Sequence, residues 1–219
     1  MKFQIKGLPL FATAAVFFGL FILLNFVKLS AIVSVPLSYF SFASVIFPLA
    51  GFLGVGSIGI VTLARLLVAV VFYGTPLSAT VYYIPTVFAS AYWTLNKRVF
   101  PVVISCVCIA LFVAHPVGFK AAAYSFYWFI PFLLAFSPRR FIFTDALSST
   151  FIAHAVGSVI WLYAHPTMPA SQWLFLIPLV AIERCIFALG MTGVYCAVAY
   201  LKKLVFGKIK SSTQSQAIS

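Results

Sequence analysis

Acidic residues are almost missing from this chain: it contains two Asp and Glu in 219 residues, against 14 Lys and Arg. Catalysis by a pair of carboxylates therefore has little material to work with. The sequence also lacks the GxSxG, Walker A and HExxH patterns, which excludes the common motifs for hydrolysis, nucleotide binding and zinc-dependent proteolysis. We predict a protein that is not an enzyme, that needs no cofactor or metal, and that does not hydrolyse ATP.

Charge of either sign is scarce, because 7% of the residues are charged and 64% are hydrophobic. A soluble domain carries about a quarter charged residues. Since a transmembrane helix needs about 20 apolar residues, 219 residues hold six to eight spans and no separate soluble domain. The prediction is an all-α integral membrane protein: one compact bundle of 6–8 transmembrane helices over residues 1–210, followed by a disordered polar tail over residues 211–219.

Charges, prolines and glycines divide the chain into eight apolar segments. Two joins leave open whether the flanking segments are full spans, half-helices or re-entrant pieces: the glycine-rich stretch 51–59 and the run His115-Pro116-Val117-Gly118. The first segment is longer than a signal-peptide core of about 7–15 residues, so we expect it to be retained. The segments cover 8–28, 31–49, 55–73, 77–94, 99–115, 118–137, 146–165 and 173–201.

The basic residues form short clusters between the apolar segments, without a basic face interleaved with aromatics, so they predict topology and not nucleic-acid binding. Cytoplasmic loops of membrane proteins are enriched in Lys and Arg. With both termini cytoplasmic and an even number of crossings, ten of the 14 basic residues fall on one side. The expected location is the bacterial cytoplasmic (inner) membrane, as a multi-pass protein. The ten are Lys2, Lys6, Lys97, Arg98, Arg139, Arg140, Lys202, Lys203, Lys208 and Lys210.

Few ionisable residues lie inside the apolar segments, and each costs at least about 2.5–3.5 kcal/mol unless it has a partner or a role. Adjacent helical residues project about 100° apart, so Glu183 and Arg184 are not expected to face one pocket together. We predict that Glu183 pairs with Arg65 on another helix at a similar depth, and that Arg184 meets water or an anionic ligand. The ion pair either fixes helix packing alone or forms part of a substrate site.

His154 lies in a run of small and hydroxyl residues that suits close helix packing. A packed, hydrogen-bonded histidine is favoured over a proton relay. Thr144 and Asp145 are expected to cap the N-terminus of the same helix. The four cysteines, Cys106, Cys108, Cys185 and Cys196, have no metal-binding spacing and are expected to be buried thiols.

Most tryptophans and tyrosines fall towards the ends of segments, where aromatic belts anchor membrane helices. Three of them, Tyr82, Tyr83 and Trp161, are expected on the outer side, either as anchors or as the lining of a pocket for a flat ligand. The other expected anchors are Trp93, Trp128, Trp173, Tyr124 and Tyr127.

The stretch Phe47-Pro48-Leu49-Ala50-Gly51-Phe52-Leu53-Gly54-Val55-Gly56-Ser57-Ile58-Gly59, followed by Phe72-Tyr73-Gly74-Thr75-Pro76-Leu77, resembles the second and third helices of the substrate-binding S components of energy-coupling-factor vitamin transporters. The run 153–158 is similar to their fifth helix. The resemblance implies a small bundle that binds a vitamin-like molecule from outside. It also implies that small residues of the first helix dock on a partner transmembrane subunit.

The leading hypothesis is therefore a small-solute uptake component that depends on a partner for energy, and the alternative is a scaffold or assembly subunit of an envelope complex. The expected partners are the lipid bilayer, a small-molecule ligand and a membrane-embedded transporter subunit with ATPase partners, and no nucleic acid. An enclosed polar pocket favours uptake, whereas exposed small-residue faces favour a scaffold. The expected substrate-binding residues are Arg184, Arg65, Glu183, His154, Tyr82, Tyr83 and Trp161. The expected docking residues, on one helical face, are Ala12, Ala15 and Gly19.

Overall fold

The computed structural model describes residue 19 and residues 43–74 and 76–216, with side chains described for most residues up to 200. These ranges contain helices and no strand, which confirms the all-α prediction for the described part. Three helices are long and apolar enough to cross a membrane, over Val55–Phe72, Ile142–Ala164 and Ile177–Tyr200. The predicted first segment and most of the second lie outside the described residues.

The described elements follow one another in short steps, with 3-10 helices (η) between several α-helices. Their bounds are α3 Ala43–Ile46, η1 Phe47–Leu53, α4 Val55–Tyr73, η2 Leu77–Tyr83, α5 Ile84–Thr94, α6 Val99–Ala114, α7 Pro116–Lys120, η3 Ala122–Trp128, α8 Phe129–Ala135, α9 Ile142–Ala164, α10 Ala170–Phe175 and α11 Ile177–Gln216.

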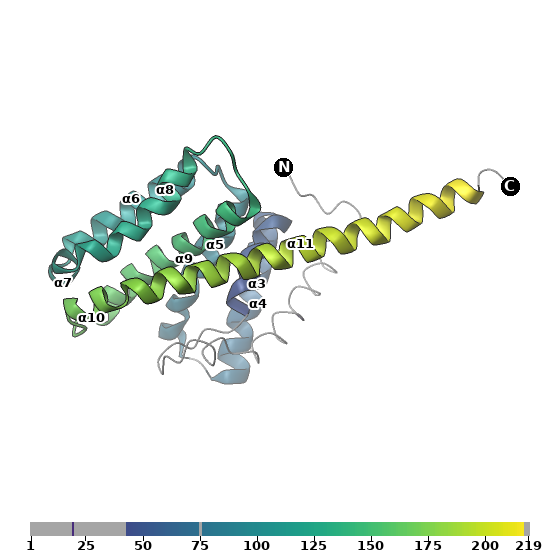
Figure 1. Ribbon diagram of the computed structural model, residues 1–219. Helices are drawn as coiled ribbons and strands as arrows, with labels where there is room; N and C mark the ends of the chain where they lie inside the picture. The colour runs from purple at the N-terminus through teal and green to yellow at the C-terminus, as the bar shows by residue number, and fades with distance from the viewer. Residues whose placement is uncertain (1–18, 20–42, 75, 217–219) are drawn as a thin grey trace.

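The two predicted interruptions are both present. Gly54 adopts φ 102° between η1 and α4, a backbone conformation that favours glycine. After α6, the His115 Nδ1 accepts a hydrogen bond from the Val117 N–H at 3.3 Å and caps α7. A Cβ at Gly118 would overlap the carbonyl oxygen of Phe112, so only glycine allows this close return of the chain. The predicted segment 118–137 is broken into α7, η3 and α8, which run back along α6 (Figure 1).

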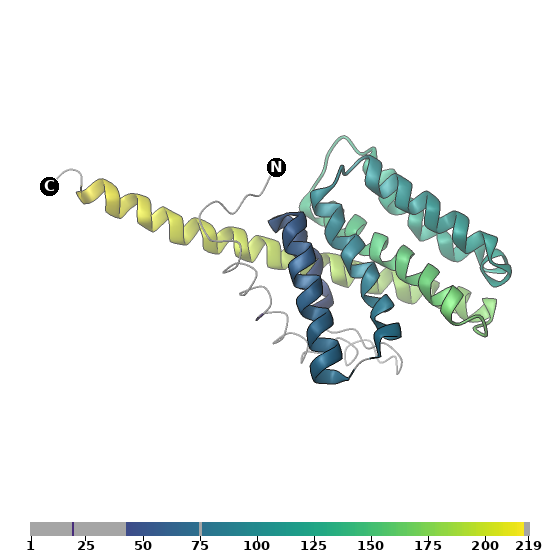
Figure 2. The same cartoon turned by 180° about the vertical axis from the view of Figure 1, so that it is seen from behind.

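Helix α9 occupies the middle of the fold and packs against α5, α6, α8 and α11. Helix α4 lies on the far side of α5 from the α6–α8 hairpin, as the reverse view shows (Figure 2). The last part of α11 extends beyond the other described helices (Figure 1). Because α11 continues to Gln216, most of the predicted disordered tail over residues 211–219 is helical instead; residues 217–219 lie outside the described part.

Two clusters of buried side chains form the core. The first joins α6, η3, α9 and α10, and its largest members include Phe112, Tyr124, Trp128, Leu162 and Trp173. The second joins α3, η1, α5, α9 and α11, and includes Leu49, Tyr92, Trp93, Ile152, Phe187 and Met191.

This core corrects two predictions from the sequence. Trp93, Trp128 and Trp173 are buried and do not anchor the surface, so among the four tryptophans Trp161 alone is exposed. Of the four cysteines, Cys108 is buried and the other three are exposed, because they lie on outward faces of α6 and α11. An apolar run does not reveal which of its faces meets another helix.

Candidate functional site

The neighbouring charges on α11 pair with each other. The Arg184 Nη2 lies 2.8 Å from the Glu183 Oε2, and the two side chains are 8% and 17% exposed. The prediction that Glu183 pairs with Arg65 is therefore wrong. Although the Cα–Cβ bonds of adjacent helical residues diverge by about 100°, both side chains are long enough to bend towards each other.

Arg65 on α4 has a different environment. Its guanidinium carbon lies 3.9 Å from the ring centre of Tyr83 and 5.2 Å from that of Phe47, and its Nη1 donates to the Thr86 hydroxyl at 3.1 Å. Aromatic faces attract a cation through the negative potential of their π-electrons. The predicted binding residues Arg65 and Tyr83 thus form one group with Phe47, separate from Glu183 and Arg184.

His154, near the middle of α9, faces the aromatic cluster of η3 and α10. Its ring centre lies 5.4 Å from that of Tyr124, which is also 5.0 Å from Trp173 and 6.3 Å from Trp128. The Tyr124 and Ser158 hydroxyl oxygens are 3.4 Å apart. Tyr124 is therefore the centre of a group that we call the Tyr124 cluster: the buried Tyr124, Trp128, Ser158 and Trp173, and the half-buried His154.

The ion pair on α11 borders the Tyr124 cluster. Helix α11 packs against α9, and its Val180 belongs to the same buried core cluster as Tyr124, Trp128 and Trp173. His154, Glu183 and Arg184 were each predicted as binding residues; His154 lies on α9 and the ion pair on α11, and these two helices pack against each other.

Three nitrogen atoms of the Tyr124 cluster are buried and have no hydrogen-bond partner among the described residues: the Nε1 atoms of Trp128 and Trp173 and the Nε2 of His154. The expectation of a packed histidine is met, whereas the hydrogen bond expected for it is not found at Nε2. Buried polar groups are nearly always satisfied by protein, water or ligand. The cluster therefore offers two indole donors and one imidazole nitrogen to a molecule that carries complementary groups.

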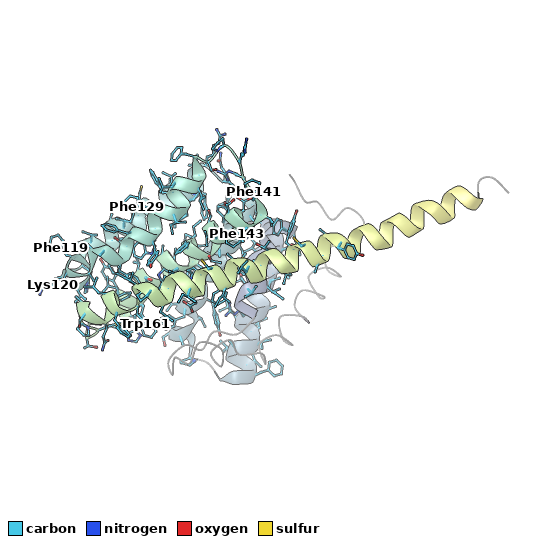
Figure 3. The ribbon with its side chains drawn as sticks, viewed as in Figure 1. Phe119, Lys120, Phe129, Phe141, Phe143 and Trp161 are labelled. Atoms are coloured by element: carbon cyan, nitrogen blue, oxygen red, sulfur yellow. The ribbon has the colours of Figure 1, made fainter. Side chains whose placement is uncertain are left out.

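Tyr82 and Trp161 form a second aromatic group at the other predicted pocket. Their ring centres are 5.8 Å apart, and His165 completes the group: its Nε2 is 3.0 Å from the Tyr82 hydroxyl, and its ring centre is 4.0 Å from that of Trp161. Tyr82 and Trp161 are exposed, and Trp161 lies near the same end of the bundle as Lys120 (Figure 3). Tyr83, which was predicted to share this site, contacts Arg65 instead.

Two hollows open on the surface of the described part. One, of about 400 Å³, lies between α4 and η2 and is lined by Thr62, Leu66, Ser78, Thr80, Val81, Tyr83, Ile84 and Val87. The other, of about 440 Å³, is lined by Ala123, Phe126, Tyr127, Ile130 and Ile177. Neither is lined by Arg65, Glu183 or Arg184.

Tyr127 connects the second hollow with the Tyr124 cluster. Its ring lines the hollow and stacks on Phe151 at 5.6 Å, and the ring of Phe151 lies 6.5 Å from that of His154. The Tyr127 hydroxyl donates to the carbonyl of Ile177 at the start of α11, at 2.7 Å. Two stacked side chains, Tyr127 and Phe151, therefore lie between the open surface and His154.

The predicted docking face is described only in part. Ala12 and Ala15 lie outside the described residues, whereas Gly19 is helical and exposed, with nothing within 4 Å of the position of a Cβ. Within the described ranges, no three His, Cys, Asp or Glu side chains gather as a metal site would require.

Sequence reasoning missed several members of both aromatic groups, namely Trp128, Trp173, Ser158 and His165. A signal existed for His165, which follows Trp161 by four residues and so lies on the same helical face. No comparable signal marks Trp128 and Trp173, because they come from separate short elements that only the fold brings together.

Comparison with known proteins identifies no relative: no family model, curated protein or solved structure matches this chain.

Proposed function

We propose that this chain is a membrane-embedded component that binds a small, vitamin-like solute at the Tyr124 cluster and depends on a partner protein for the energy of uptake. The observation that carries the proposal is the set of three unpartnered buried nitrogens on Trp128, Trp173 and His154 around one tyrosine. Each unsatisfied buried group costs about 1–3 kcal/mol, so an occupant that supplies complementary groups stabilises the fold as it binds.

The residues of the cluster indicate the kind of solute. The side chains around it are aromatic, since Phe112, Tyr124 and the two indoles meet edge to face; a flat solute enters by parting these rings and replaces their edge-to-face contacts with its own. Indole N–H groups only donate, so the solute needs acceptors such as carbonyl, carboxylate or ring-nitrogen atoms. The charges of Arg184 and Glu183 balance each other in their ion pair, which favours a solute of low net charge.

The route to the cluster passes the hollow beside Tyr127. A turn of this side chain breaks one hydrogen bond, to the carbonyl of Ile177, and opens the path towards Phe151 and His154. Tyr127 is half-buried, and its rotation involves one side chain and not the movement of a loop. Tyr127 is therefore proposed as the gate of the site.

The orientation that we propose has six or eight crossings in the bacterial inner membrane and both termini in the cytoplasm. The loop after α5 and the loop after α8 support it, because Arg140 on one loop donates to the carbonyl of Lys97 on the other at 2.9 Å. Both loops are basic and so belong on one side. Helices α7 and α10 contact each other at the opposite end of the bundle, near Lys120 and Trp161 (Figure 3).

Mass spectrometry of small molecules that co-purify with the full chain tests the proposal. Wild-type protein purified without added ligand should carry a flat compound with acceptor groups in stoichiometric amount. Trp173→Phe removes one indole donor and should lower the amount of bound compound at least about tenfold, which corresponds to about 1.4 kcal/mol.

Trp93→Phe is the matched control. Trp93 is also buried with an unpartnered Nε1, but it belongs to the second core cluster. This variant should keep the compound. Wild-type protein without any stoichiometric compound, or equal loss in the two variants, would contradict binding at the Tyr124 cluster.

A second candidate function, a membrane scaffold, is favoured by one face of α4. Within the described ranges, nothing lies within 4 Å of the point that a Cβ would occupy at Gly56 or Gly59, and Leu63 and Leu67 continue the same face and are exposed. Small residues let helices approach closely in a membrane. If the chain is a scaffold, Gly59→Leu should disrupt its complex with a partner while no variant of the Tyr124 cluster has an effect.

A further inference from the structure

The loops between α5 and α6 and between α8 and α9 form a basic surface of the described part. Four cations lie there, Lys97, Arg98, Arg139 and Arg140, together with one carboxylate, Asp145. Asp145 pairs with Lys97 and, at 3.8 Å, with Arg140. The only other acidic residue of the chain, Glu183, pairs with Arg184. Among the described residues, the exposed Arg98 and Arg139 form no ion pair, because both acidic residues pair with other cations.

Hydrogen bonds hold the two loops in one arrangement. Arg140 donates to the carbonyls of Lys97 and Ala135, at 2.9 and 2.8 Å. The Asn96 side chain accepts from the Arg98 N–H at 2.9 Å, and Ser137 donates to the carbonyl of Arg139 at 2.8 Å. These contacts fix the backbone of both exposed arginines and leave their guanidinium groups outside the network, where an anion that meets the surface can reach them.

Exposed apolar side chains border the basic loops. Leu95 and Val99 flank the first loop, and Phe136 and Phe141 flank the second; all four are exposed. Phe141 lies at the end of the bundle away from Lys120 (Figure 3). A surface that places cations next to exposed apolar side chains matches a molecule with an anionic head and an apolar tail.

We propose that this surface, which we call the arginine surface, binds the headgroup of an anionic phospholipid through Arg98 and Arg139, while Leu95, Val99, Phe136 and Phe141 contact its acyl chains. The proposal is independent of the solute site. An acidic protein segment would not need the apolar border, and free phosphate would not use it. Anionic lipids are concentrated in the cytoplasmic leaflet, where basic residues beside membrane helices attract them.

Native mass spectrometry of the full chain in mixed micelles with equal amounts of phosphatidylglycerol and phosphatidylcholine tests this proposal. Wild-type protein should retain phosphatidylglycerol preferentially. Arg98→Gln and Arg139→Gln should each reduce the preference roughly fivefold, and the double variant should abolish it. Lys120→Gln, which removes one exposed cation at the opposite end, should retain the wild-type preference.

A second double variant, Arg98→Lys with Arg139→Lys, keeps both charges and should keep most of the preference; it separates loss of charge from loss of fold. Inorganic phosphate should compete poorly with phosphatidylglycerol. Equal retention of the two lipids by wild-type protein would overturn the proposal, as would a loss in Lys120→Gln equal to that in Arg98→Gln. Complete displacement by millimolar phosphate would also overturn it, because the site would then recognise phosphate without a lipid.

Discussion

Replacement of Glu183 by Gln perturbs the ion pair that borders the proposed solute site. The substitution keeps the shape of the side chain and removes the negative charge that pairs with the Arg184 guanidinium, whose side chain is 8% exposed. Removing one partner of a buried pair costs about 3–5 kcal/mol. The Gln amide oxygen still accepts a hydrogen bond, and Glu183 is 17% exposed. We therefore expect the unfolding free energy to fall by less than this, about 2–3 kcal/mol.

The double variant Glu183→Gln with Arg184→Gln distinguishes a stranded charge from a loss of packing. It removes both charges, so it should be less destabilised, relative to wild type, than the single variant Glu183→Gln. Asp145→Asn is the matched control, since it neutralises the other acidic residue of the chain. Asp145 is 14% exposed, but its partners Lys97 and Arg140 are 30% and 24% exposed and stay hydrated when the carboxylate is lost, and the Asn oxygen can still accept from the Tyr92 hydroxyl. We therefore expect a loss of about 1 kcal/mol.

Chemical unfolding of the purified variants in detergent, followed by tryptophan fluorescence, measures these differences. If Glu183→Gln and the double variant are equally unstable, the charge of Arg184 does not depend on Glu183. The description of the two residues as a mutually dependent pair would then be refuted.

Two further predictions concern local contacts, and a third concerns the orientation of the chain in the membrane. Gly51→Ala should lower the unfolding free energy by about 1–3 kcal/mol, because its Cβ would overlap the Ser90 carbonyl oxygen and lie 2.9 Å from the Trp93 Cβ. Gly59→Ala should be neutral in the same unfolding experiment. Equal effects of the two substitutions would contradict this packing. Ser149→Ala removes a buried hydrogen bond of 2.8 Å to the Ala89 carbonyl between α9 and α5, and should cost about 1 kcal/mol, more than Tyr82→Phe at the surface. In a variant without the native cysteines, Lys97→Cys and Ala170→Cys should be labelled from opposite sides of the membrane; labelling of both from outside would exclude the proposed orientation.

Much of the helical order is predictable from the sequence, because glycine, proline and apolar runs are local signals. The break at Gly54 has a backbone conformation that few residues other than glycine accept. The short helices after His115 follow from Pro116, which begins α7. The neighbourhood of Tyr82 and Trp161 was also predictable in part, since both lie near the ends of apolar segments on the same expected side.

Side-chain partners were less predictable. The ion pair between Glu183 and Arg184 depends on how two long side chains bend, which the 100° spacing of a helix does not determine. The burial of Trp128 and Trp173 depends on the packing of η3 and α10 against α6 and α9. Hydropathy alone does not distinguish an aromatic residue at the end of a span from one that enters the core of a broken segment.

The central claim, that a solute accepts hydrogen bonds from the buried indoles around Tyr124, is tested most directly by NMR of the chain with ¹⁵N-labelled tryptophan. The sequence contains four tryptophans, so four indole N–H signals are expected. When the compound extracted from wild-type protein is added back to protein from which it was removed, the signals of Trp128 and Trp173 should shift, while those of Trp93 and Trp161 stay in place. Four unchanged signals, or shifts confined to Trp93 and Trp161, would contradict the account.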